Sequence, residues 1–183
     1  MSEIRSTGLD GVLEIVPARF DDARGFFSET YNAAQLAKVG IGLTFVQDNH
    51  SLSARRGVLR GLHYQLPPCA QDKLVRVVRG AIFDVAVDIR KGSPTFKKWI
   101  GVELSAQKWN QLLVPKGFAH GFVTLTENTE VVYKVTEYYS PEQDRSIRYD
   151  DPDIAIDWPV PVGELQLSDK DVTAPRLVNA QIF

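Results

Sequence analysis

The sequence predicts an all-β protein, a sandwich or small barrel built from many short strands. Runs of β-branched and aromatic residues recur at close spacing, and turns rich in Pro, Gly and Asn separate them. One segment has a helical pattern, and no repeat or low-complexity run interrupts the chain. Many short strands with almost no helix are typical of two layers around one core.

The expected strands share an apolar pattern that ends at turn residues. They cover residues 12–16, 26–31, 43–47, 58–65, 74–78, 82–89, 99–104, 111–114, 121–125 and 130–139. One helix is expected over residues 32–39, where the sequence is rich in Ala and Leu and the pattern stops at Gly40.

The strand over residues 82–89 indicates where a site lies. Val85 and Val87 fall on one face of this strand, whereas Asp84 and Asp88 fall on the other. An alternating strand with a polar face inside a barrel can line a binding site.

Length and composition predict one globular domain over residues 1–183. Hydrophobic residues make up 44% of the chain and charged residues 24%. The barrel core is expected over roughly residues 40–140. Residues 141–183 are expected to wrap the barrel in loops and short turns, because the chain after Tyr149 is rich in Asp and Pro.

Charge and cysteine content exclude several classes of partner. The net charge of −2 offers no basic balance for nucleic acid, and no stretch reaches the roughly 18 apolar residues of a membrane span. With Cys69 alone, neither an intrachain disulfide nor a cysteine zinc cluster is possible. These features, and an N-terminus without the apolar run of a signal peptide, favour the cytoplasm.

The chain has three histidines, His50, His63 and His120. His120 ends a P-x-G-x-x-H turn that resembles the second half of the cupin barrel motif, but the first-half H-x-H of metal-binding cupins is absent. No metal is therefore expected. A site with two histidines and one carboxylate remains an alternative, because such a set can hold iron.

A metal-free barrel needs acid–base groups, and the sequence offers His63, Lys73 and Tyr133. Each also has a structural interpretation. The histidine can be a satisfied, partly buried side chain, the lysine a solvated strand-edge residue, and the tyrosine a core aromatic with a paired hydroxyl.

Motifs in order from about Gly11 to Asp171 give a more specific signal. They are Asp22-x-Arg24-Gly25-x-Phe27-x-Glu29, FVQDNHS at 45–51, VLRGLHYQ at 58–65, KLVR at 73–76, DVAVDIR at 84–90, PKGFAHGF at 115–122, Tyr133-Lys134 and Leu167-Ser168-x-Lys170-Asp171. Together they strongly resemble the dTDP-4-dehydrorhamnose 3,5-epimerase family.

This resemblance implies a cupin-type jelly-roll β-barrel with a few short helices, forming homodimers that often share an N-terminal strand. It implies a dTDP-linked 4-keto-6-deoxyhexose as substrate and no cofactor. The implied reaction inverts C3 and C5 of dTDP-4-dehydro-6-deoxy-D-glucose, by removing protons alpha to the C4 ketone, and gives dTDP-4-dehydro-L-rhamnose.

The resemblance also assigns roles to residues. His63 matches the base, Asp171 its carboxylate partner, Lys73 the group that stabilises charge on the C4 oxygen, and Tyr133 the acid on the opposite face. The matched substrate-binding residues are Arg24, Phe27, Glu29, Gln47, Asp48, Asn49, Arg60, Lys73, His120, Tyr139, Asp144 and Lys170.

Two of these matches carry open questions. Tyr139 matches an aromatic that stacks on thymine, but it can equally be a surface aromatic at a strand end. Asp144 stands where many relatives have Glu, and its shorter side chain reaches less far.

Three other interpretations stay open. One is a mono-epimerase or keto-isomerase acting on a related nucleotide sugar. Another, from a different class, is a non-catalytic sugar-binding barrel, which predicts loss of the base or the acid. The third is a metal-dependent cupin oxygenase.

Overall fold

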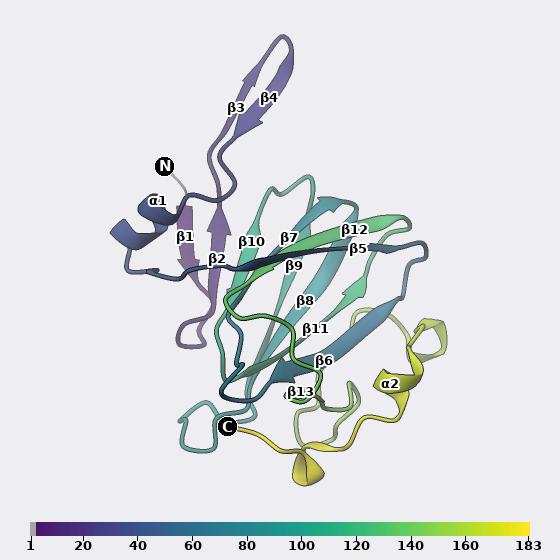
Figure 1. Ribbon diagram of the computed structural model, residues 1–183. Coiled ribbons are helices and arrows are strands. Elements are labelled where there is room, and N and C mark those ends of the chain that lie inside the picture. Colours follow the sequence, from purple (N-terminus) through teal and green to yellow (C-terminus); the bar gives the residue numbers. More distant parts are fainter. Residues whose placement is uncertain (1–2) are drawn as a thin grey trace.

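Two antiparallel β-sheets form the framework of the computed structural model, which describes residues 3–183 (Figure 1). The six-stranded sheet has, in spatial order, β1 (Glu3–Ser6), β2 (Leu13–Val16), β10 (Gln111–Val114), β7 (Lys73–Arg79), β12 (Thr129–Val135) and β5 (Gln47–Ser53). The five-stranded sheet has β13 (Asp144–Ser146), β6 (Leu59–Gln65), β11 (Phe118–Thr124), β8 (Ala81–Asp88) and β9 (Trp99–Ser105).

The main core lies between the two sheets. Val75 and Val77 of β7 pack with Ile82 and Ala86 of β8 and with Phe122 of β11, and all five are at most 5% exposed. These residues come from the β-branched and aromatic runs that predicted strands, so the all-β prediction is confirmed. Among residues 3–183, no helix has the length and apolar character needed to cross a bilayer.

The strand predicted over residues 43–47 is wrong. Leu43 and Phe45 lie in an irregular segment, where they pack on the cluster around Leu36. The strand here is β5, which pairs with β12 along its whole length. Its sequence QDNHSLS is polar on both faces, so hydrophobic periodicity cannot find it.

The predicted helix is confirmed as α1 (Ala33–Lys38). Asn32 is its N-cap, and the side chain of that residue accepts a hydrogen bond from the backbone N–H of Gln35. Gly40 follows with φ of +85°, the left-handed conformation that commonly ends a helix.

The strand predicted over residues 26–31 is shorter than expected. It is β4 (Gly25–Ser28), which pairs with β3 (Arg19–Asp22) in a hairpin separate from both sheets. Figure 1 shows this hairpin projecting away from the barrel. Phe20, Phe26 and Phe27 are each more than half exposed on it.

The C-terminal segment after β13 lies on the outer side of the five-stranded sheet. Ile147, Ile154 and Leu177 pack against Leu62 and Val85. The regular pieces of this segment after β13 are the 3₁₀ turns Val162–Glu164 and Leu177–Asn179 and the short helix α2 (Asp169–Val172). The wrap brings α2 beside β6.

Replacing Gly101 by Ala should lower the free energy of unfolding by roughly 1–3 kcal/mol, because a Cβ there would overlap the ring of Phe83. The Phe83 ring packs edge-on against Trp158, with 6.3 Å between the ring centroids, so it has little room to move away from the added Cβ. The matched control is Gly92→Ala, where the added Cβ would meet nothing within 4 Å. Urea unfolding of both variants measures the difference, and equal stabilities would contradict this packing.

Candidate active site

A cavity of about 430 Å³ opens between the two sheets and is lined by His63, Lys73, His120, Tyr133 and Asp171. His63 lies on β6, Lys73 on β7, His120 on β11 and Tyr133 on β12, and Asp171 lies on α2. Strand pairing sets part of the arrangement, since His63 and His120 are direct cross-strand neighbours. The sheets therefore fix most of the groups that the sequence singled out for chemistry.

Close backbone packing lets β6 and β11 present these two histidines. Gly61 has a φ of +139°, and a Cβ on it would overlap the backbone of Gly121. Only glycine fits such a conformation and such an approach.

His63 and Asp171 form a hydrogen-bonded pair, with 2.5 Å between Nε2 and Oδ1. Burial alone would raise the pKa of the Asp171 carboxyl. Hydrogen bonds from His63, Ser168 and the backbone N–H of Gly61 outweigh burial and lower this pKa below its ordinary value. The carboxylate is thus charged near neutral pH and able to stabilise a positive imidazolium.

Lys73 loses its proton more easily than an ordinary lysine. Burial lowers the pKa of its ammonium to about 8, although the negative charges of Asp144 and Asp84 partly oppose the shift. Its Nζ lies 3.5 Å from the backbone oxygen of His63. At neutral pH the cavity therefore contains a partly desolvated positive charge.

Tyr133 keeps its proton. Burial raises the pKa of its hydroxyl, Arg60 opposes that rise, and Asp144 adds to it. A phenol with a raised pKa is a proton donor rather than a base near neutral pH.

Sequence reasoning gave Asp84 no role, yet it is a member of this site. It is fully buried, and its Oδ1 accepts a hydrogen bond from Nε2 of His120 at 2.7 Å. Its Oδ2 has no hydrogen-bond partner among residues 3–183. The signal was present, because Asp84 lies on the polar face of the alternating strand.

Three predicted binding residues, Asp144, Lys170 and Tyr139, contact one another beside the five-stranded sheet. Lys170 of α2 forms an ion pair with Asp144 of β13, and the hydroxyl of Tyr139 donates to the same carboxylate at 3.3 Å. Tyr139 in turn connects to β5, because its backbone N–H donates to Oε1 of Gln47. These residues are brought together next to β6, the strand of His63.

The residues predicted on β5 divide between its two faces. Gln47 and Asn49 are half-buried and hydrogen-bonded to each other at 2.9 Å. Asp48 points to the exposed face, where it pairs with Lys134. His50 also lies on the exposed face and pairs with Glu130.

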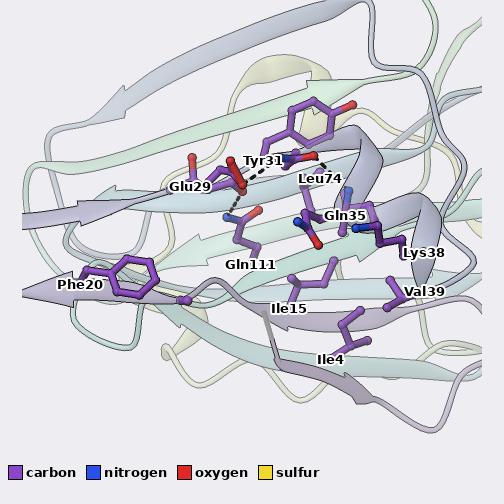
Figure 2. A pocket seen from close by; sticks show the side chains of 14 residues that line it. Ile4, Ile15, Phe20, Glu29, Tyr31, Gln35, Lys38, Val39, Leu74 and Gln111 are labelled. Carbon is purple, nitrogen blue, oxygen red and sulfur yellow. Dashed lines mark hydrogen bonds between the residues drawn. The ribbon is translucent and has the colours of Figure 1, made fainter. Parts of the chain in front are cut away.

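Arg24, Phe27 and Glu29 are not brought to the cavity by their own chain. Arg24 lies at the hairpin turn with a side chain that is 90% exposed, and its guanidinium pairs with Asp22. Glu29 lines a different cavity of about 270 Å³, between β1–β2, the hairpin base and α1 (Figure 2). There its carboxylate accepts a hydrogen bond from Asn32.

No group of three or more His, Cys, Asp or Glu side chains suited to a metal ion occurs within residues 3–183. The cavity instead combines a His–Asp pair, a buried ammonium and a protonated phenol. The fold and the site together define a β-barrel with acid–base machinery for a small bound molecule.

The chain belongs to the dTDP-4-dehydrorhamnose 3,5-epimerase family, whose model matches residues 6–179. It is 53% identical to the Shigella flexneri enzyme of that name over 178 residues, which is 97% of each chain. The family resemblance of the motifs is thus confirmed.

Solved structures of epimerases from other organisms are also similar to this chain. A dTDP-6-deoxy-D-glucose-3,5-epimerase from Legionella pneumophila, in complex with dTDP-4-keto-L-rhamnose, matches with a TM-score of 0.93 and 48% identity over 98% of this chain and 94% of that one. A 3′-monoepimerase from Streptomyces bikiniensis, in complex with dTDP-quinovose, matches with a TM-score of 0.87 and 35% identity over 93% and 86%. The fold is the cupin-type jelly roll.

A titration of lysine side chains by NMR should find that Lys73 loses its proton near pH 8, well below ordinary lysines. Asp144→Asn should lower the Lys73 pKa further, because it removes a negative charge that favours the ammonium. Asp48→Asn removes a carboxylate from the exposed face and serves as control. A Lys73 pKa in the ordinary lysine range would contradict its burial.

Proposed function

We propose that this protein inverts C3 and C5 of dTDP-4-dehydro-6-deoxy-D-glucose and produces dTDP-4-dehydro-L-rhamnose. The observation that carries the proposal is one cavity lined by the His63–Asp171 pair, Lys73 and Tyr133, in a chain of this epimerase family. The retained base and acid favour an enzyme over a non-catalytic sugar-binding barrel.

The ketone at C4 makes this chemistry possible. A proton on C3 or C5 is acidic because the electron pair left on the carbon moves into an enolate, which places negative charge on the C4 oxygen. His63 takes the proton from one face of the sugar, and Tyr133 returns a proton to the opposite face of the same carbon. The carbon is then inverted, and both side chains regain their starting state by proton exchange with water.

The remaining groups stabilise charge. Asp171 stabilises the imidazolium formed when His63 accepts the proton. The ammonium of Lys73 stabilises the enolate oxygen, an electrostatic effect typically worth about 3–4 kcal/mol per donor. Because the pKa of Lys73 is about 8, this stabilisation is present at neutral pH and is lost as pH rises through that value.

The nucleotide would lie toward Arg60 and Tyr139. Within residues 3–183, the hydrogen bonds of the Arg60 guanidinium are long, at 3.4 Å to Oγ of Ser53 and to the backbone oxygen of Leu52, so its donors can turn to a diphosphate. The ring of Tyr139 is 58% exposed and suits stacking on thymine. Lys170 and His120 add positive and donor groups, while Gln47, Asn49 and Asp144 supply polar contacts.

A homodimer would complete the site. Arg24, Phe27 and Glu29 match binding residues of the family, yet they lie on or beside a hairpin that projects away from the barrel and do not line the cavity of their own chain. The exposed aromatic side chains of that hairpin favour burial against another surface. We infer that the hairpin of one protomer reaches the cavity of its partner.

The cytoplasm is the proposed location. Nothing in the chemistry requires an oxidising compartment, and the single cysteine, Cys69, fits a reducing one.

Incubating the protein with dTDP-4-dehydro-6-deoxy-D-glucose in deuterated water should place deuterium at both C3 and C5, because each inversion exchanges one carbon-bound proton with solvent. NMR follows the label, and a reductase that accepts only the rhamno product traps it. His63→Ala should lower turnover at least ~10²-fold by removing the base.

The labelling pattern separates the alternatives. Deuterium at one carbon alone would indicate a mono-epimerase, a less favoured reading because the monoepimerase match is the more distant one. Near-normal turnover by His63→Ala would refute its assignment as the base. No label at either carbon would overturn the proposed substrate.

Mixing inactive variants should reveal a shared site. If the hairpin acts in the partner's cavity, an Arg24→Ala/His63→Ala heterodimer has one cavity with both defects and one intact cavity. Random exchange at equal amounts makes half of the dimers mixed, so about a quarter of wild-type turnover should return. Steady-state assays after co-refolding measure this recovery.

The control pairs His63→Ala with Tyr133→Phe, because both residues line the cavity of one chain. No mixture of these two variants contains an intact cavity, so no activity should return. Equal failure of the Arg24→Ala mixture would contradict a hairpin that works across the dimer.

A further inference from the structure

We propose that Ser168 is a positioning residue of the acid–base site: its hydroxyl holds the Asp171 carboxylate in line with His63. The proposal rests on the proposed function and deepens it, because it names a group that keeps Asp171 aligned with the proposed base His63. Ser168 belongs to the motif Leu167-Ser168-x-Lys170-Asp171, but the sequence alone assigned it neither a catalytic nor a binding role.

The two oxygens of Asp171 have different partners. Oδ1 meets Nε2 of His63 at 2.5 Å, and Oδ2 accepts a hydrogen bond from Oγ of Ser168 at 2.8 Å. The side chain of Asp171 is 3% exposed, so water has little access to replace a lost donor. With both oxygens engaged, the carboxylate cannot rotate without breaking a buried hydrogen bond.

Ser168 is itself anchored to the strand that carries His63. Two residues earlier, Gln166 forms a parallel bridge with Val58, at the start of β6. Its backbone N–H donates to the oxygen of Gly57 at 2.8 Å, and its oxygen accepts from the N–H of Leu59 at 2.9 Å. The hydroxyl of Ser168 therefore has a fixed position relative to β6.

The helix α2 is too short to orient the carboxylate alone. It has four residues, and Ser168 is its N-cap, with Oγ accepting from the backbone N–H of Asp171 at 3.3 Å. The same oxygen thus starts the helical turn and donates to the carboxylate of that turn. Removal of the hydroxyl has both a structural and a chemical consequence, which a test must separate.

The chemical consequence concerns the tautomer of the base. A charged Asp171 aimed at Nε2 keeps a proton on that nitrogen of neutral His63, which leaves the Nδ1 lone pair to accept a substrate proton. If the carboxylate turns away, the imidazole loses this preference and its orientation. Small misplacements of a catalytic group can cost up to about a hundredfold in rate.

Ser168→Ala should lower kcat roughly ten- to a hundredfold with KM within about threefold, since the residues assigned to substrate binding are unchanged. Ser168→Thr keeps the hydroxyl and should restore most of the loss. The matched control is Thr173→Val, which removes another hydroxyl of the same helix, one that donates to the backbone oxygen of Asp169 and not to Asp171. Thermal unfolding of all three variants reports any structural cost.

Two readouts distinguish positioning from a merely structural role. In the substrate-free protein, the far-downfield proton resonance of the His63–Asp171 hydrogen bond should shift or broaden in Ser168→Ala and remain in Thr173→Val. In a double-mutant cycle, Ser168→Ala should cost almost nothing further once His63 is Ala. The resonance needs no substrate, so it tests Ser168 even where the proposed reaction fails.

The proposal is overturned by any of three results. One is a kcat of Ser168→Ala within about twofold of the wild type together with an unchanged resonance. Another is an equal loss of kcat in Thr173→Val. The third is an undiminished effect of Ser168→Ala in the His63→Ala background.

Discussion

The hydrogen bond between His63 and Asp171 is the contact on which the site depends, and it joins residues 108 positions apart. A carboxylate as buried as Asp171 is costly unless it is paired, so the bond to His63 favours the position of α2 against β6. The contact therefore does two things. It helps to hold residues 141–183 on the barrel, and it gives His63, the proposed base, its partner. A change that loosens the wrap therefore reaches His63 through this bond, and it reaches Lys73 through the charges of Asp144 and Lys170.

The charges around the cavity have a common logic. Asp84 and Asp144 favour the positive form of Lys73, while burial and Lys170 disfavour it, and the balance leaves the pKa of that ammonium near 8. At neutral pH Asp171 is negative, Lys73 is positive and Tyr133 keeps its proton. These three states can coexist because the barrel fixes the distances between the groups. Proton transfer to and from a carbon needs this set in place before the substrate arrives.

The sequence predicted the features that local patterns encode. The strand β8 was predicted from its alternation of apolar and polar residues. The helix α1 was predicted from its Ala- and Leu-rich sequence, which ends at Gly40. β5 was missed because both of its faces are polar, and its place in the sheet comes from pairing with β12. Roles for Asp171 and Lys170 came only through the family resemblance, because no local pattern reports a contact across a hundred residues. The polar face of β8 marked Asp84, but not its contact with His120 of β11. Ser168 received no role because it contacts Asp171, whose own partner His63 is distant in sequence.

The hairpin shows where prediction from one chain ends. A two-stranded ribbon is marginal in isolation, so β3–β4 needs support. It finds part of that support in Trp109, whose ring meets Phe26 edge-on at 4.8 Å and whose indole N–H donates to Ser28. These two contacts support the hairpin through Phe26 and Ser28 but leave Phe27 and Arg24 exposed. A supported hairpin with exposed side chains suits a segment that meets a second surface. The barrel thus holds the acid–base groups within one chain, while part of substrate recognition would be completed by association.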